Sequence, residues 1–114
     1  MKQVFPVPGR GDVVRVTLAP RGGGRTRPAR RAAVVLSPQA YNAKVGRAIL
    51  CPIAPRVKGY PFEVVIPSGQ PVEGAILADR AESFDWRAAR AERVCSLPDA
   101  VIEEALGKLR TLVG

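Results

Sequence analysis

The chain has 114 residues, a formal net charge of +8 and no histidine. The length predicts one domain over residues 1–114. The absence of histidine excludes Ser-His-Asp and Cys-His catalysis, and also a ribonuclease built on a histidine pair. Any acid–base chemistry must therefore use Asp, Glu, Lys, Tyr or an assisted hydroxyl, with Arg available to stabilise charge.

Short apolar stretches separated by turn residues predict an antiparallel β protein, and 11 Gly and 11 Pro fit many turns. Gly11-Asp12 forms a turn before the first expected strand, and Ser37-Pro38 closes the second. Between the second and third strands, residues 39–46 are polar and are predicted to be a loop or a short helical turn. The expected strands are 13–18, 32–36, 48–53, 62–66, 74–78, 81–86 and 91–95.

A helix is predicted at the end of the chain. Ser96 is expected to cap it, Pro98 suits its first turn, and Asp99 complements the positive helix end. Apolar residues then recur at helical spacing, so this helix is expected to pack on the sheet. Strands, close turns and one terminal helix together predict a small antiparallel barrel.

The remaining composition bears on compartment and metals. No apolar stretch reaches the ~18 residues of a membrane helix, and residues 1–6 lack the apolar core of a signal peptide. We therefore expect a cytoplasmic protein that does not bind membranes. Cys51 and Cys95 are expected to be reduced, buried thiols. Without histidine they do not complete a zinc tetrad by themselves, so we expect no metal site and no cofactor.

The positive charge is concentrated near the beginning of the chain. Residues 1–31 contain eight Lys or Arg against one acid, a net charge of +7, and five of the arginines lie within residues 21–31. A solvated loop would use charges of both signs, whereas arginine offers a planar fork that fits phosphate and stacks on bases. The stretch is therefore predicted to bind a polyanion, with Arg25, Arg27 and Arg30 as candidate RNA contacts.

Two segments give the most specific signal. The first runs from Arg31 through Ala-Ala-Val-Val-Leu-Ser-Pro to Tyr41-Asn42, and the second is Lys58-Gly59-Tyr60-Pro61-Phe62-Glu63-Val64. In this order they resemble the MazF/PemK family of toxin endoribonucleases, and the resemblance covers nearly the whole chain. It implies an SH3-like antiparallel barrel with helices, a homodimer with an RNA groove across its interface, and an acidic antitoxin (MazE-like) peptide as partner.

The resemblance also implies a reaction. The family cuts single-stranded RNA without a metal, leaving 2′,3′-cyclic phosphate and 5′-hydroxyl ends, and it places its catalytic arginine on Arg31. A guanidinium at the start of a strand is also a good phosphate ligand on its own physical chemistry. By the same resemblance Asp79 lies near the RNA groove, although a turn-capping carboxylate is an equally good interpretation. Arg56 and Tyr60 are further candidate RNA contacts, through phosphate and base stacking respectively.

The sequence departs from the family at two polar positions. The family threonine after the third strand is Ala54 here, and the loop glutamate falls on Thr26. Thr26 and Lys58 are the candidate catalytic substitutes, and Arg30 and Ser37 are further possibilities. Two other functions keep the same fold. One is an RNA-binding barrel with weakened catalysis; the other is a gyrase-targeting toxin, which the lack of a C-terminal Trp-Gly-Ile ending disfavours.

Overall fold

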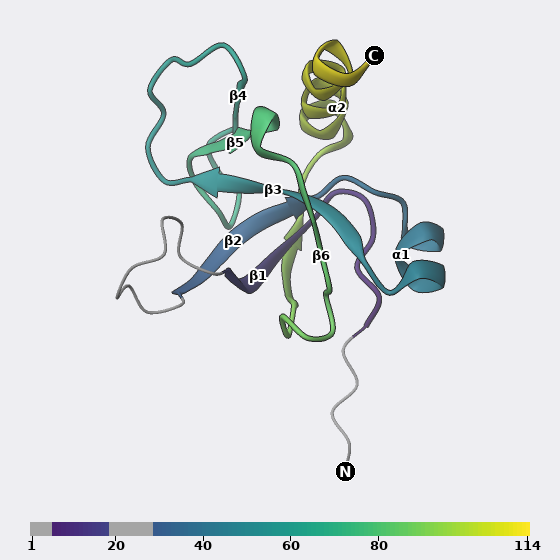
Figure 1. The fold of residues 1–114 in the computed structure, drawn as a ribbon. Helices are drawn as coiled ribbons and strands as arrows, with labels where there is room; N and C mark the ends of the chain where they lie inside the picture. The colour runs from purple at the N-terminus through teal and green to yellow at the C-terminus, as the bar shows by residue number, and fades with distance from the viewer. Residues whose placement is uncertain (1–5, 19–28) are drawn as a thin grey trace, which may run out of the picture.

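The computed structural model describes residues 6–18 and 29–114, and within them the chain forms one seven-stranded sheet with two α-helices (Figure 1). The spatial order is β4-β5-β3-β2-β1-β7, with β6 paired to β3, and all the strand pairs are antiparallel. The predicted antiparallel fold with a C-terminal helix is therefore confirmed. The strands are β1 (Asp12–Leu18), β2 (Ala29–Val35), β3 (Ala48–Ala54), β4 (Glu63–Val65), β5 (Ala75–Leu77), β6 (Glu82–Phe84) and β7 (Glu92–Ser96).

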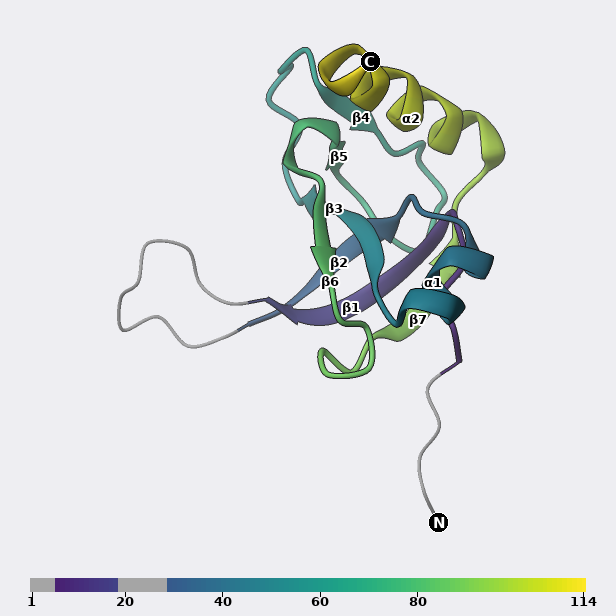
Figure 2. The same cartoon turned by 45° about the vertical axis from the view of Figure 1, so that its right-hand side comes forward.

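The helical segments follow the strands that they connect. Helix α1 (Gln39–Val45) occupies the polar stretch between β2 and β3, so the helical alternative for that stretch is the right one. A 3₁₀ turn, η1 (Ala78–Arg80), follows β5 directly. Helix α2 (Asp99–Val113) closes the chain and packs against β4 and η1 (Figure 2). No helix in the described ranges is long and apolar enough to cross a membrane.

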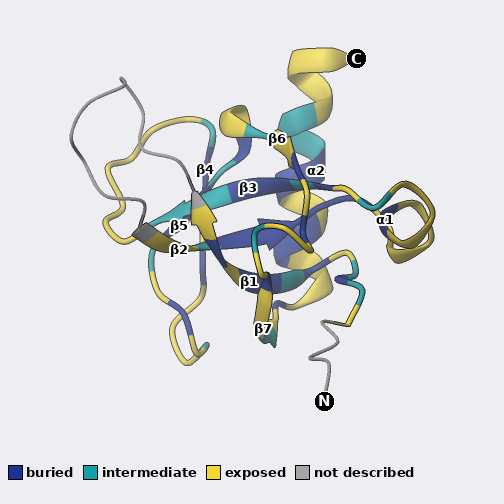
Figure 3. Ribbon diagram, turned by 60° about the horizontal axis from the view of Figure 1, so that its bottom comes forward, coloured by how far each residue is buried: buried dark blue, intermediate teal, exposed yellow. Residues whose placement is uncertain are grey.

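Strand alternation divides the core into two clusters, one on each face of the central strands. Figure 3 shows buried residues along β1, β2 and β3. Val13 and Val34, which pair across β1 and β2, point into the first cluster, where the apolar face of α2 covers them. Their neighbours Val14 and Ala33 point into the second cluster with Trp86. A one-residue step along a strand therefore exchanges the two faces.

Two side chains beside the sheet have defined partners. Trp86 is buried, and its indole N–H donates to the Asn42 carbonyl at 3.1 Å, so this aromatic belongs to the core. Ser96 does not cap α2, and that prediction was wrong. The residue ends β7, and its hydroxyl donates to Asp12 Oδ1 at 2.9 Å, while Pro98 occupies the cap position with no side-chain cap.

The cysteines are both free thiols, although only one is fully buried. Cys51 lies inside the first core cluster, and burial, with a smaller effect from the Asp79 charge, raises the pKa of its thiol to about 12. Cys95 is half-buried on β7. Burial raises the pKa of Cys95 as well, against a lowering effect from Arg93.

Candidate functional site

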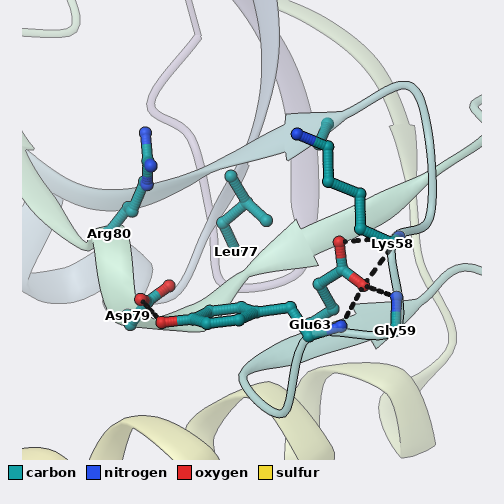
Figure 4. Close-up of a pocket in the computed structure, with 8 residues that line it drawn as sticks. Lys58, Gly59, Glu63, Leu77, Asp79 and Arg80 are labelled. Atoms are coloured by element: carbon teal, nitrogen blue, oxygen red, sulfur yellow. Dashed lines mark hydrogen bonds between the residues drawn. The ribbon is translucent and has the colours of Figure 1, made fainter.

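A cavity of about 480 Å³ opens where the end of β3, the turn before β4 and the turn after β5 meet (Figure 4). It is open to solvent on one side, and cations and acids line it together. Its lining residues are Ala54, Lys58, Gly59, Tyr60, Glu63, Leu77, Asp79 and Arg80. Segments more than twenty residues apart in the sequence thus supply a single concave surface.

The turn over residues 58–63, here called the pocket turn, is held by its own glutamate. Glu63 is only 6% exposed, and its Oε1 accepts the backbone N–H groups of Lys58, Gly59 and Tyr60 at 3.1, 2.9 and 3.0 Å. Its Oε2 also accepts from Lys58 N at 3.2 Å. Gly59 has φ of +80°, which places the glycine where an L side chain would be strained. The backbone of the pocket turn is therefore fixed, while the Lys58 side chain extends from it.

A hydrogen bond closes the opposite side of the cavity. The Tyr60 phenol donates to Asp79 Oδ2 at 2.6 Å, so the pocket turn and η1 are linked directly (Figure 4). Donation to this carboxylate raises the pKa of Tyr60, with smaller contributions from desolvation and from the Asp79 charge. The Tyr60 ring also lies 6.0 Å from the Phe62 ring, centroid to centroid, in a tilted arrangement. Tyr60 is 46% exposed, so a base can stack on its ring.

Ala54 lies in the cavity wall at the last residue of β3. It pairs with Ala75 of β5, so the two methyl groups share one face of the sheet with Leu77 and Glu63. The chain approaches this residue closely, because a Cβ on Gly74 would lie 1.9 Å from the Ala54 carbonyl oxygen. Ala54 thus occupies a pocket position, where it offers no side-chain hydrogen bond.

Arg31 lies on the same face of the sheet as this wall. It pairs with Val16 and alternates with Ala33, which pairs with Pro52 of β3. The pairing of β2 with β3 ends at Ala33 and Pro52, and by strand alternation Arg31 and Ala54 each share the face of these two residues. Its side chain is exposed, and within the described residues it makes no hydrogen bond or ion pair, although it does not itself line the cavity. The guanidinium is therefore available to an anion on this face of the sheet.

Arg30, one residue earlier, points to the other face and is engaged by the protein. It donates to the Thr17 hydroxyl at 3.4 Å and to the carbonyls of Arg15 and Arg90 at 3.1 and 3.2 Å. It also forms an ion pair with Glu92 at 3.5 Å. These contacts brace β1 against the β7 side of the sheet, so Arg30 has a structural role in addition to any contact with RNA.

The structure brings together Lys58, Tyr60 and Asp79 from the predicted site residues, in one cavity. Arg56 is exposed between β3 and the pocket turn and does not line the cavity. The remaining candidates Arg25, Thr26 and Arg27 lie outside the described residues.

Sequence reasoning missed Glu63 and Arg80, which also line the cavity. The sequence did contain a signal for Glu63, because this acid lies inside the apolar run 62–66. A carboxylate seldom lies in a strand interior without a local partner, so its position indicated a specific contact. Among the described residues no group of three or more His, Cys, Asp or Glu side chains is arranged to hold a metal ion.

The charges of this surface fit a phosphodiester ligand. Lys58 and Arg80 line the cavity and Arg31 lies on the adjoining strand face, so three cations can contact phosphate oxygens. The Tyr60 phenol is already committed to Asp79, which leaves the face of its ring for a base. The site therefore has the two components of single-strand nucleic-acid recognition, cations along a groove and an aromatic platform.

Comparison with known proteins gives a consistent result. A family model described as PemK-like, MazF-like toxin of type II toxin-antitoxin system matches residues 9–113. The Escherichia coli K12 protein named endoribonuclease toxin MazF is 39% identical over 95% of this chain and 96% of its own length. The endoribonuclease toxin ChpB of the same strain is 34% identical over 91% and 92%.

Solved structures agree in fold. A MazE-MazF complex from Deinococcus radiodurans is 44% identical with a TM-score of 0.89, covering 96% of this chain and 98% of the other. The MazF structure from the same organism, also 44% identical, has a TM-score of 0.86 and covers 96% and 99%. A mycobacterial endoribonuclease at 19% identity and a TM-score of 0.77 shares the fold.

Proposed function

We propose that this chain, which belongs to the PemK-like, MazF-like toxins of type II toxin–antitoxin systems, is an endoribonuclease that cleaves single-stranded RNA without a metal ion. The observation that carries the proposal is the cavity containing Lys58, Tyr60 and Ala54, together with the exposed Arg31 on the sheet face that Ala54 shares. It acts in the cytosol as the toxin of a toxin–antitoxin pair, on messenger RNA.

The reaction is a transesterification within the RNA. The 2′-hydroxyl oxygen attacks the adjacent phosphorus, and the bond from phosphorus to the 5′-oxygen breaks, giving a 2′,3′-cyclic phosphate and a 5′-hydroxyl. One proton leaves the 2′-hydroxyl and one is supplied to the 5′-oxygen, while negative charge builds up on the phosphoryl oxygens. Arg31 stabilises that charge with its guanidinium fork.

Lys58 is the residue within the described part of the site that can supply the proton to the leaving oxygen. Its backbone is fixed by Glu63, and its side chain enters the cavity beside Ala54, where the family has a hydroxyl. Thr26 is the proposed second polar group, contributed from the loop. Arg25, Arg27, Arg30 and Arg56 add binding energy along the RNA, while Tyr60 and Asp79 contact it at the pocket.

Two partners follow from the same reasoning. The chain acts as a homodimer, whose interface extends the RNA groove. An acidic antitoxin segment occupies the basic groove in place of RNA, because both ligands present anionic groups to the same cations. MazE-MazF complexes among the similar structures support a toxin–antitoxin pairing of this kind.

Cleavage of a defined single-stranded RNA by the purified protein in EDTA tests the proposal. The expected products have 2′,3′-cyclic phosphate and 5′-hydroxyl ends, and an acidic antitoxin peptide should inhibit their formation competitively. Cleavage that requires a divalent ion, or products with 5′-phosphate ends, would contradict the proposed reaction. RNA binding without any cleavage would favour the weakened RNA-binding barrel, which the alanine at position 54 makes the second candidate.

A further inference from the structure

The pocket turn is held from two sides, and both contacts come from residues with no assigned part in the reaction. Inside the turn, the Glu63 carboxylate accepts all of its contacts from the backbone N–H groups of residues 58–60. Outside it, the Lys108 ammonium on α2 donates to the carbonyls of Pro61 and Glu63 at 2.9 and 2.8 Å. The same ammonium is 3.6 Å from Glu104 one helical turn away.

We propose that Glu63 and Lys108 are positioning residues of the RNA site, which hold the pocket turn so that Lys58 and Tyr60 face the substrate. This inference rests on the proposed function. It assigns the two residues to binding rather than to proton transfer. Glu63 lines the same cavity as Ala54 and is the one buried carboxylate among the described residues, so it is the obvious alternative candidate for a general base.

The hydrogen bonds argue against Glu63 as the base. Each carboxylate oxygen accepts through two lone-pair directions, and here three backbone N–H groups make three contacts with Oε1 and one with Oε2, so Oε1 is fully used by the turn. Abstracting a proton from a 2′-hydroxyl through Oε1 would require the carboxylate to release part of this set and free the turn. The same set gives Glu63 a clear role, because without it three N–H donors would lose their partner in a turn that has no regular secondary structure.

Lys108 extends this support to the helix. The two carbonyls that it binds flank the start of β4, so the ammonium fixes the position at which the pocket turn enters the sheet. Its side chain is 31% exposed and its hydrogen bonds reach across 45 and 47 residues of sequence. Loss of the ammonium should displace the turn without opening the core, because the buried face of α2 is formed by other residues.

The test compares matched variants of the whole chain. In Glu63→Gln, the amide oxygen in the place of Oε1 can still accept the three N–H groups, whereas Glu63→Leu removes every acceptor. Lys108→Met removes the ammonium, and Lys44→Met on α1 is the control. Lys44 is exposed, carries the same charge and lies outside the cavity lining, so the control measures the loss of one positive charge alone.

Two readouts are measured on each variant. Steady-state and single-turnover cleavage separates KM from kcat, and amide hydrogen exchange at residues 58–60 reports the order of the turn without reference to RNA. The kcat of Glu63→Gln should stay within ~10-fold of the wild-type value. If the carboxylate were the general base, its loss would instead lower kcat by the ~10²–10⁴ that acid–base catalysis contributes. Glu63→Leu and Lys108→Met should lose amide protection and raise KM by roughly 5- to 100-fold, because misplacement by about 1 Å has effects of this size.

Two results would overturn the positioning role. One is a fall in kcat of ~10² or more in Glu63→Gln with amide protection retained, which would make Glu63 a proton-transfer group. The other is an unchanged KM in Glu63→Leu and Lys108→Met although the amides have lost protection. A wild-type protein that fails to cleave RNA would instead refute the proposed function, so the two failures are distinguishable.

Discussion

The close approach of Gly74 to the end of β3 predicts a large and local effect of adding one methyl group. In Gly74→Ala the new Cβ would lie 1.9 Å from the Ala54 carbonyl oxygen and 2.9 Å from its carbon. Since non-bonded carbon and oxygen atoms pack at roughly 3.3 Å or more, the two segments must separate by over ~1 Å. Gly74 also has φ of +119°, where an L residue is strained by an additional ~1–3 kcal/mol.

Gly69→Ala is the matched control, because Gly69 has φ of +93° but no atom within 4 Å of the added Cβ. It should destabilise by only the conformational cost of about 1–2 kcal/mol. At roughly 4–8 °C per kcal/mol, this lowers Tm by about 5–15 °C. Gly74→Ala adds the steric clash, and it should therefore cost at least ~3 kcal/mol in total and lower Tm by more than about 12 °C.

Thermal unfolding by circular dichroism, with single-turnover RNA cleavage on the folded fraction, measures both consequences. Gly74→Ala should slow cleavage even where the protein is folded, because the displaced β5 moves Ala54 and Leu77 in the cavity wall. Equal decreases in Tm for the two alanine variants would refute the reasoning. They would show that only the glycine conformation matters and that the end of β3 accommodates the methyl group.

The remaining predictions concern the cavity itself. If Lys58 has taken over proton transfer, Lys58→Met should lower the single-turnover rate by ~10²–10⁴, whereas Ala54→Thr should change it by less than ~10-fold. A large rate gain in Ala54→Thr with no loss in Lys58→Met would reverse that assignment. The hydrogen bond to Asp79 raises the pKa of Tyr60. In a Tyr41→Phe background, Asp79→Ala should therefore lower the pH midpoint at which the Tyr60 phenolate absorbance appears. An unchanged midpoint would mean that the bond does not form in solution. Because the folded-state pKa is the higher one, the bond stabilises the fold at neutral pH, and its contribution should disappear as the pH rises through the folded-state pKa of Tyr60.

Much of the fold was predictable because alternation and turn residues are local signals. In β1, Val13 lies in the first apolar cluster and Val14 and Val16 lie in the second, while Arg15 and Thr17 are exposed. Gly11 before the strand has φ of +93°, which suits a tight turn. The apolar stripe of α2 was visible at helical spacing. Its first part, Val101, Ile102, Ala105 and Leu106, is buried as expected, whereas Leu112 and Val113 at its end are exposed. Ser96 was misassigned because a serine two residues before a proline favours a helix cap locally, whereas Ser96 pairs with Asp12 across the sheet and its hydroxyl donates to the Asp12 carboxylate.

Site residues could be predicted only where a short stretch of sequence identifies them. Lys58 and Tyr60 stand in the pocket turn, and Asp79 was found by resemblance. The bond from Tyr60 to Asp79 spans 19 residues, and no pattern in the sequence specifies it. In the sequence, Lys108 looks like an ordinary polar residue of an amphipathic helix. Its contacts with the pocket turn could not be predicted, because they depend on how α2 packs against β4.

The orientation of Arg31 follows from strand parity once the strand is placed. Arg31 alternates with the buried Ala33 and Val35, and Arg30 alternates with Val34 on the opposite face. Two adjacent arginines with the same local composition therefore have different surroundings. Arg30 is bound to carbonyls and Glu92, whereas Arg31 is exposed on the sheet face that Ala54 shares. This difference is the physical basis for assigning transition-state stabilisation to Arg31.

Single-turnover cleavage of one defined RNA by Arg31→Ala tests that assignment most directly, with Arg15→Ala as the control. Arg15 is exposed on the neighbouring strand but points to the opposite face, so its loss removes the same charge away from the cavity. Arg31→Ala should cut the RNA ~10²–10³-fold more slowly while unfolding at the wild-type temperature. Arg15→Ala should stay within ~3-fold of the wild type, as expected for a surface charge distant from the reacting phosphate. A folded Arg31→Ala protein that cleaves at the wild-type rate would contradict the account.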